Sequence, residues 1–365
     1  NMILCSNPSE QFKSYQSEIE QAVTKVLRSN TYILGEQVRY LEKEFAEYIG
    51  TASAIGVANG TDAIEIALRA LNIGFGDEVI SVSHTAVATI AAIEAVGAKA
   101  VLVDIDAAFY TLNPNCLEEA LSKRTKAVIA VHLYGNPADL DPILSFCNKE
   151  NLFLIEDASQ AHGAIYNGKK LGSVGDIGCF SCYPTKNLGA IGDAGLVTSN
   201  NVELANKIRM IREYGWKDRV SIFRGRNSRL DELQAAVLRI KLKYLDNDNQ
   251  KRRDIAKIYN DELSSLPLVL PKTRSNDESV FHLFVIQVAN QQNLLSFLKQ
   301  KDIMAAVHYP LPVHLHPAYI GRVLSSKNLS VTEDIVKKII SLPIYPELTI
   351  QDIKLITNAM HKFFK

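Results

Sequence analysis

The residue best equipped for chemistry is Lys186, in the segment Cys179-Phe-Ser-Cys-Tyr-Pro-Thr-Lys186-Asn-Leu-Gly-Ala190. Lysine forms Schiff bases with carbonyl compounds. Asp157 lies upstream of it, and a carboxylate facing a pyridinium nitrogen is the partner that pyridoxal phosphate (PLP) chemistry needs. Each residue also has a simpler interpretation when taken alone: Lys186 as an exposed loop lysine and Asp157 as an aspartate at the end of a strand. Together, in this order, they predict a PLP enzyme.

The residues around Asp157 extend this prediction to the cofactor ring. Asp157 follows the apolar run Leu152–Ile155, so we expect it at the carboxyl end of a strand, where α/β sheets bind ligands. An ionised carboxylate there would keep the pyridine nitrogen protonated. Gln160 is close enough in sequence to hydrogen-bond the phenolic oxygen of the ring. His162 either supports these groups or simply packs in the core, and we favour packing.

A phosphate site is predicted at Asn59-Gly60-Thr61-Asp62, where a short apolar run leads into a helix. Glycine lets the backbone approach an anion, and the first amides of a helix are unpaired at the positive end of its dipole. Thr61 adds a hydroxyl, and Ser181, at a strand end, is a further candidate. Asn59 or Asp62 could equally be a plain N-cap. The segment is not a P-loop, because it lacks the Gly-Lys-Ser/Thr ending.

The elements that must position these residues alternate between short apolar runs and helical stretches over residues 60–200. The alternation predicts an α/β sandwich with a mainly parallel sheet. From Ser228 to about Leu263 the pattern is that of a long amphipathic helix. A strand over His282–Val288, a helix over Gln292–Lys301, a strand over Met304–His308 and a closing helix over Ile350–Phe364 follow. We therefore expect a large domain over residues 1–245 and a smaller α+β domain over residues 246–365.

Composition narrows the class of protein. The chain has 365 residues, 47% hydrophobic and 22% charged, with a formal net charge of +0. A protein that binds nucleic acid regardless of sequence usually has a basic excess, so we expect no nucleic-acid partner. No stretch approaches the apolar length that a membrane span needs, and no signal peptide pattern is visible. Five thinly spread cysteines favour reduced thiols and a cytoplasmic setting, and no metal site is expected.

Several ordered motifs along the chain resemble the fold-type-I PLP enzymes, and more closely the DegT/DnrJ/EryC1/StrS sugar aminotransferases. They are Thr31-Tyr-Ile-Leu-Gly35, Leu41-Glu-Lys-Glu-Phe-Ala46, Asn59-Gly-Thr-Asp-Ala63, Glu156-Asp-Ala-Ser-Gln-Ala-His-Gly-Ala164, Tyr183-Pro-Thr-Lys-Asn187 and Asn227-Ser-Arg-Leu-Asp-Glu-Leu-Gln-Ala-Ala236. The resemblance implies that Lys186 binds PLP covalently, that Asp157 pairs with the pyridine nitrogen and that Gln160 contacts the ring oxygen. Gly60, Thr61 and Ser181 would bind the phosphate.

The resemblance also implies a homodimer with shared active sites, in which Asn227 of the neighbouring subunit completes the phosphate site. Two departures from the family pattern stand out. Ala86 aligns with a residue that is often aromatic and stacks on the cofactor ring, and His84 is an alternative cover for that ring. The second departure is Asp193-Ala194-Gly195, where many relatives have Gly-Gly.

On the substrate side, the resemblance implies a nucleotide-linked keto-sugar as amino acceptor and glutamate as donor, released as 2-oxoglutarate, with pyridoxamine phosphate formed between the half-reactions. A nucleotide diphosphate needs cations, and arginine suits phosphate through its fork of donors. The candidates follow Tyr214-Gly-Trp216 or precede Asn227 and are Lys217, Arg219, Arg224 and Arg226. A solvated basic loop is the alternative.

The segment His308-Tyr309-Pro310-Leu-Pro312-Val-His314-Leu-His316 is a second signature. Its prolines hold the chain extended, which disfavours a metal site on a helix face. It resembles a segment of relatives that aminate C3 of dTDP-linked 3-keto-6-deoxyhexoses, so that His308, Tyr309 and Tyr183 would contact the hexose. The implied product is a dTDP-3-amino-3,6-dideoxyhexose, used for surface polysaccharide or a glycosylated metabolite.

Four other functions remain open at this point. They are a 4-keto nucleotide-sugar aminotransferase, a sugar dehydratase of the same fold, a fold-type-I enzyme acting on amino acids, and a non-catalytic regulator or binding module. The dehydratases replace the lysine with histidine, so Lys186 argues against that branch. The Asn227 and His308 segments disfavour an amino-acid enzyme. A regulator would be expected to have lost Lys186 or Asp157, and both are present.

Overall fold

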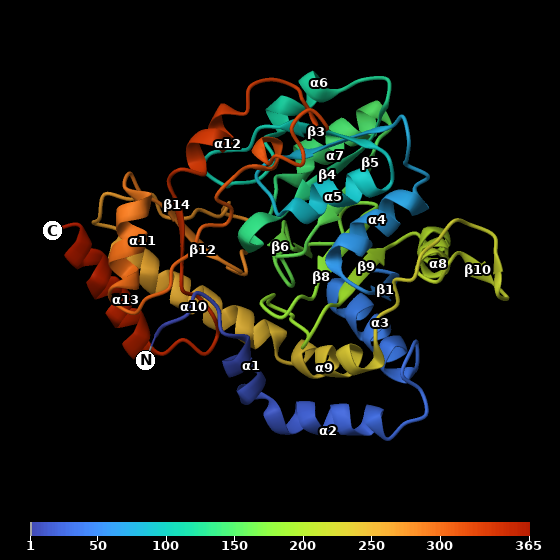
Figure 1. The fold of residues 1–365 in the computed structure, drawn as a ribbon, viewed down its shortest axis with the longest axis horizontal. Helices are drawn as coiled ribbons and strands as arrows, with labels where there is room; N and C mark the ends of the chain where they lie inside the picture. The colour runs from blue at the N-terminus through green and yellow to red at the C-terminus, as the bar shows by residue number, and fades with distance from the viewer. Residues whose placement is uncertain (1) are drawn as a thin grey trace.

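The computed structural model describes residues 2–365 and is built around one eight-stranded sheet with the strand order β1-β9-β8-β5-β4-β2-β3-β13 (Figure 1). Strands β2, β3, β4, β5, β8 and β13 run parallel, whereas β9 is antiparallel to both β1 and β8. The predicted α/β fold with a mainly parallel sheet is confirmed. The strands are β1 Ser53–Val57, β2 Glu78–Val82, β3 Lys99–Val103, β4 Thr125–Val131, β5 Phe153–Asp157, β8 Ile177–Ser181, β9 Gly195–Ser199 and β13 Leu324–Ser325.

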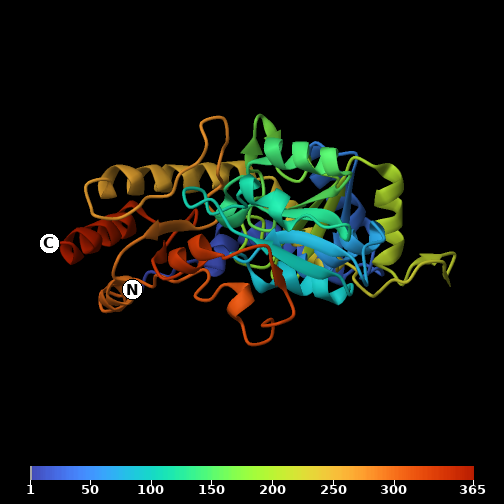
Figure 2. The ribbon, with the colours of Figure 1, turned by 90° about the horizontal axis from the view of Figure 1, so that it is seen from above.

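Helices cover both faces of the sheet, and this burial explains why its strands are apolar almost throughout. Figure 2 shows α7 and α5 on opposite sides of the strands. Every residue of β1, β2 and β9 is buried. The helices of this layer are α3 Glu36–Ile49, α4 Gly60–Ala70, α5 Val87–Ala95, α6 Leu117–Ala120, α7 Leu140–Glu150 and α8 Val202–Ile211. None of the helices in residues 2–365 is both long and apolar enough to cross a membrane.

The single helix predicted over 228–263 is divided in two, α9 Glu232–Leu242 and α10 Leu245–Leu263. The break falls at Lys243 and Tyr244, and from there α10 runs toward α11 Gln291–Lys299 and α13 Ile350–Phe363 (Figure 1). At the N-terminal end of the chain, α1 Pro8–Ser14 and α2 Gln16–Leu27 lie beside α9. Tyr15 between them stacks on Tyr244 with ring centroids 4.3 Å apart.

A second hydrophobic core forms around α10, the antiparallel pair β12 Phe284–Gln287 and β14 Ile339–Leu342, and the helices α11 and α13. Ile3 from the N-terminal end belongs to it. The strand predicted over Met304–His308 is wrong: that segment has an isolated bridge from Ala306 to Ser341 and otherwise no regular pairing. The remaining short elements are β6 Ile165–Tyr166, β7 Lys169–Lys170, β10 Trp216–Lys217, β11 Val220–Ser221 and α12 Ser330–Ile335.

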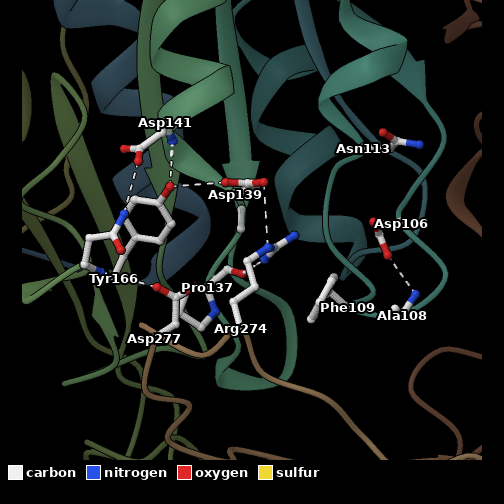
Figure 3. A network of polar contacts seen from close by, with 12 residues as sticks. Asp106, Ala108, Phe109, Asn113, Pro137, Asp139, Asp141, Tyr166, Arg274 and Asp277 are labelled. Carbon is white, nitrogen blue, oxygen red and sulfur yellow. Dashed lines mark hydrogen bonds and ion pairs between the residues drawn. The ribbon is translucent and has the colours of Figure 1, made fainter.

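The segment between α10 and β12 is fastened to the large sheet layer. Arg274 donates to the carbonyl of Pro137 at 3.1 Å, and its guanidinium lies 4.0 Å from the ring centroid of Phe109 (Figure 3). Asp277 accepts the Asn167 amide at 3.3 Å. Further along, the amide of Val280 donates to Gly135, and Val280 is part of the first core. The large and small halves are therefore joined by packed chain instead of a free linker.

Candidate active site

A cavity of about 290 Å³ opens at the carboxyl ends of β4, β5 and β8 and at the first turns of α4 and α5. Its volume is near the lower end of the range for small-molecule sites, roughly 300–1,000 Å³. Eight of the predicted residues line it, drawn from four segments of the chain: Gly60, Thr61, Ala86, Asp157, Gln160, Ser181, Tyr183 and Lys186.

Lys186 is presented by a tight loop after β8. Its amide donates to the carbonyl of Tyr183 at 2.8 Å, and the amide of Ala190 returns to Cys182 at 2.8 Å. Gly189 is required in this loop, because a Cβ there would lie 2.4 Å from the carbonyl oxygen of Pro184. Burial lowers the pKa of the Lys186 amine to about 8, although the charge of Asp157 opposes the shift. A larger share of the amine is thus neutral, and nucleophilic, near neutral pH.

Asp157 is the last residue of β5 and only 5% exposed. Its Oδ2 accepts a hydrogen bond from the hydroxyl of Thr89 at 2.8 Å, and its Oδ1 accepts one from the amide of Ser159 at 3.2 Å. Thr89 lies in the first turn of α5, so the carboxylate also faces the positive end of that helix. The carboxyl group of Asp157 therefore lies in the wall of the cavity that Lys186 also lines.

The predicted phosphate end is built by a close approach of α4 to β8. A Cβ on Gly60 would lie 2.5 Å from the Cβ of Ser181, so only glycine fits. Asn59 is the N-cap of α4, and its side chain accepts a hydrogen bond from the amide of Asp62 at 2.8 Å. Of the two residues that the sequence offered as N-cap, Asn59 and Asp62, it is therefore Asn59 that caps the helix. Within residues 2–365, the amides of Gly60 and Thr61 have no hydrogen-bond partner. Two free amides, two hydroxyls and a helix N-terminus fit a phosphate group.

Gln160 lines the cavity, and its side-chain amide is held in place by two hydrogen bonds within the chain. The backbone amide of Tyr134 donates to Oε1 at 2.7 Å, and Nε2 donates to the hydroxyl of Tyr309 at 3.1 Å. A side-chain amide has two hydrogens on its nitrogen, so one remains for a ring oxygen. Tyr309 does not line the cavity itself but is one hydrogen bond behind it.

Sequence reasoning missed several residues that support the site. Tyr134 lies behind Gln160, where its hydroxyl contacts His84 at 2.8 Å and donates to the carbonyl of His308. Thr85 bonds Thr89 at 2.9 Å, and the spacing of two threonines four apart at a helix start was the available signal. His132 lines the cavity and contacts the buried Glu156 at 3.0 Å.

The packing interpretation of His162 agrees with its full burial and its contact with the Phe180 ring, 5.4 Å between centroids. Ala86 lines the cavity, as its alignment with a ring-covering residue requires. The other candidate for covering the ring, His84, is buried among Tyr110 and Tyr134 and is not in the cavity wall. Burial lowers the pKa of His84 to about 4.

The predicted cations lie outside the cavity of their own chain. Lys217, Arg219 and Arg224 are exposed on and after the β10–β11 hairpin, which projects from the body of the molecule (Figures 1 and 2). Arg226, in contrast, is ion-paired with Asp62 at 3.2 Å and with Glu65 on α4. These ion pairs hold Arg226 within its own chain, and its assignment to a nucleotide diphosphate stays a prediction.

Asn227 is exposed and lines a second cavity of about 420 Å³. That cavity shares Asn59 and Asp193 with the first one, so the two lie side by side. Asn227 is not among the residues that line the first cavity of its own chain.

His308 and His314 are held by neighbouring side chains. His308 contacts the hydroxyl of Ser341 at 2.9 Å through Nδ1, and burial together with the charge of Lys186 lowers its pKa to about 4. His314 bonds Ser83 at 2.7 Å and Glu333 at 3.1 Å. Across residues 2–365, no group of three or more His, Cys, Asp or Glu side chains is arranged to hold a metal ion.

Comparison with known proteins gives matches over nearly the whole chain. The model of the DegT/DnrJ/EryC1/StrS aminotransferase family matches residues 13–361. The chain is 45% identical over 350 residues to dTDP-3-amino-3,6-dideoxy-alpha-D-galactopyranose transaminase of Aneurinibacillus thermoaerophilus, covering 96% of each protein.

Two solved structures have the same fold over almost their whole length. DesV of Streptomyces venezuelae superposes with a TM-score of 0.97 at 40% identity, covering 100% of this chain and 99% of that one. NtdA of Bacillus subtilis, solved with bound cofactor PMP, gives a TM-score of 0.89 at 31% identity and covers 96% and 82%.

Proposed function

Because the chain belongs to the DegT/DnrJ/EryC1/StrS aminotransferase family, we propose that it transfers the amino group of glutamate to a dTDP-linked 3-keto-6-deoxyhexose. The product would be a dTDP-3-amino-3,6-dideoxyhexose. The observation that carries the proposal is the convergence of Lys186 and Asp157 on one cavity, in a protein 45% identical to a transaminase named for such a sugar.

The enzyme is a PLP-dependent aminotransferase, and the cavity suits that cofactor. A buried carboxylate, a lysine with a lowered pKa and a helix start with free amides match a ring nitrogen, a carbonyl carbon and a phosphate, respectively. When bound, PLP takes up the amino group of a donor and delivers it to an acceptor carbonyl, with its ring as electron sink.

Within this assignment each residue has a defined task. The Nζ of Lys186 would hold the cofactor and, once the amino group of the substrate has displaced it, would serve as the acid–base group for the substrate carbon. Asp157 would keep the ring nitrogen protonated. Gly60, Thr61 and Ser181 would bind the phosphate, and Gln160 would contact the ring oxygen through its remaining amide hydrogen.

We further propose that the active site is completed by a second copy of the chain. Asn227 is exposed and lies in a cavity that adjoins the first through Asn59 and Asp193. Lys217, Arg219 and Arg224 lie on or beside a projecting hairpin, where they would reach the nucleotide diphosphate bound to the neighbouring subunit. Such an arrangement makes the homodimer a requirement for activity.

Mixed dimers test the shared site. If Asn227 acts across the interface, then Lys186→Ala and Asn227→Ala subunits, each strongly impaired alone, regain about a quarter of parental activity when mixed equally and allowed to exchange. The expected gain arises because half of the dimers are mixed and each has one intact site. Native mass spectrometry verifies exchange, and a mixture of Lys186→Ala with the parental chain is the control. Exchanged mixtures no more active than the separate variants would place Asn227 in its own chain's site.

The choice of C3 over C4 rests on the segment that contains His308 and Tyr309. Tyr309 is bonded to Gln160 in the cavity wall, and the carbonyl of His308 accepts from the buried Tyr134. The Tyr309 side chain is thus held directly behind the cavity wall, the His308 side chain is held by its bond to Ser341, and Tyr183 lines the cavity. We propose that all three bind the hexose. Fixed polar contacts discriminate strongly, because a wrong substrate leaves them buried and unpaired.

Product analysis tests the proposed substrate. Incubation with glutamate and a panel of 3-keto and 4-keto nucleotide sugars should give amination of the dTDP-linked 3-keto sugar at least about a hundredfold faster than its 4-keto isomer, about 2.7 kcal/mol in transition-state energy. NMR of the product locates the amine. His308→Ala should reduce this preference more than it weakens PLP binding. An amine at C4 would make the enzyme a 4-keto-sugar aminotransferase and leave the PLP assignment intact.

We propose a domain division near residue 245 and a cytoplasmic location. The first is supported by the two hydrophobic cores, although β13 of the small half pairs with β3 of the large sheet. The second is supported by the five cysteines, which are all free thiols.

A further inference from the structure

We propose that Thr89 is a positioning residue for the PLP ring, acting through the carboxylate of Asp157, and that Thr85 fixes the direction of its hydroxyl. The inference rests on the proposed function, because it gives Asp157 the ring nitrogen as partner. It adds two residues that the sequence pattern did not identify.

The contacts of Asp157 leave little freedom in how its carboxylate is held. Each oxygen has one hydrogen bond within residues 2–365, Oδ2 from Thr89 and Oδ1 from the amide of Ser159. The Ser159 bond, at 3.2 Å, is the longer one and comes from the backbone two residues along. Thr89 comes from a different element, α5, so among the hydrogen bonds of residues 2–365 it alone ties the side chain of Asp157 to a second element of the fold.

The direction of the hydroxyl chain follows from proton counting. An ionised carboxylate only accepts, so the hydrogen of Thr89 must point to Asp157. The oxygen of Thr89 is then free to accept, and Thr85 donates to it across 2.9 Å. Thr85 and Thr89 are 3% and 1% exposed, so water does not compete for either bond. A hydrogen bond donated to the ionised form of a carboxylate stabilises that form, which is the one that keeps the ring nitrogen protonated.

The experiment measures the ring nitrogen directly. Protein loaded with PLP that is ¹⁵N-labelled in the pyridine ring is examined by NMR, and kcat is measured alongside. Thr89→Val removes the hydroxyl at nearly constant shape. We expect the ¹⁵N resonance to move toward the unprotonated position and kcat to fall about 10- to 100-fold, the range for losing a hydrogen bond to a charged group. Thr89→Ser, which keeps a hydroxyl, should recover most of both values, and Thr85→Val should show a smaller shift of the same sign.

Thr332 supplies the matched control. It is fully buried and donates to Asp104 at 2.7 Å, which is the same kind of bond at a site outside the cavity. Thr332→Val should lower thermal stability but leave the ¹⁵N resonance in its parental place. In the Asp157→Asn background, Thr89→Val should change kcat by less than about twofold, because a residue that acts through Asp157 has nothing left to position.

Three outcomes would overturn the inference: a parental ¹⁵N resonance in Thr89→Val, a Thr332→Val shift of equal size, or a full Thr89→Val effect in the Asp157→Asn background. If Thr89→Val does not fold, Thr89→Ala carries the same test because it cannot crowd α5. Borohydride labelling of the parental protein is done first. Failure of PLP to attach at Lys186 would refute the proposed function, whereas attachment with an unmoved ¹⁵N resonance would refute only the role of Thr89.

Discussion

Replacement of Lys186 by alanine abolishes turnover, because no second amine of residues 2–365 lines the cavity and could both hold the cofactor and move the proton. The parental protein with PLP absorbs visible light, and borohydride fixes the label on the peptide that contains Lys186. We expect Lys186→Ala to lose both the covalent label and all measurable product. Its circular dichroism spectrum should match that of the parental protein, which would show that the variant is folded.

Lys241 is the matched control for this experiment. It is 4% exposed, burial lowers the pKa of its amine to about 8, and Cys182 is a neighbour, as it is for Lys186. Its amine donates to Gln11 and does not face the cavity. A label on Lys241, or on any lysine other than Lys186, would show that a lowered pKa and not the geometry of the cavity selects the amine, and the assignment of Lys186 would be wrong.

Asp157→Asn lowers kcat about a thousandfold, or about 4 kcal/mol, while the protein still binds PLP. The proposed phosphate contacts of Gly60 and Thr61 lie on α4 and not on β5, so we expect affinity for the cofactor to be largely retained. An uncharged amide no longer favours a protonated ring nitrogen, and the ring becomes a poorer electron sink. Single-turnover kinetics with glutamate and equilibrium titration with PLP separate the two effects.

Asp104 offers the comparison for that variant. It also follows a parallel strand, β3, but accepts from Thr332 and from the amides of Ile105 and Val331 outside the cavity. Asp104→Asn should cost stability and leave kcat of the folded enzyme within about twofold. Turnover of Asp157→Asn near the parental rate would remove Asp157 from its role.

The residues predicted from sequence with most success are those fixed by local chain geometry. Asp157 ends a buried strand, Gly60 opens a helix and Lys186 lies in a loop closed by Gly189, so each location follows from a few neighbouring residues. Thr89 and Tyr134 were missed because their roles depend on partners far away in sequence, Asp157 and His308. No periodicity in the chain reveals such pairs.

Errors in the predicted elements have similar causes. Residues 228–263 contain no glycine or proline that would end a helix, yet the helix breaks at Lys243 and Tyr244. Tyr244 stacks on Tyr15 and donates to Glu18, so tertiary contacts with the N-terminal helices accompany a break that local propensity does not predict. The ion pairs of Arg226 were not predicted either, because its two carboxylate partners lie on α4, more than 150 positions away.

The packed chain between α10 and β12 bears on where natural or engineered insertions can enter this protein. Its first part is exposed, with Ser264, Ser265 and Pro267 at the surface, and would accept extra residues or a reporter peptide. Its last part would not, because Ser279 and Val280 are buried and both bond to Gly135. The connection between α10 and β12 thus contains a first stretch that tolerates insertions and a last stretch that does not. The first is a natural place for an affinity tag that leaves the catalytic cavity intact.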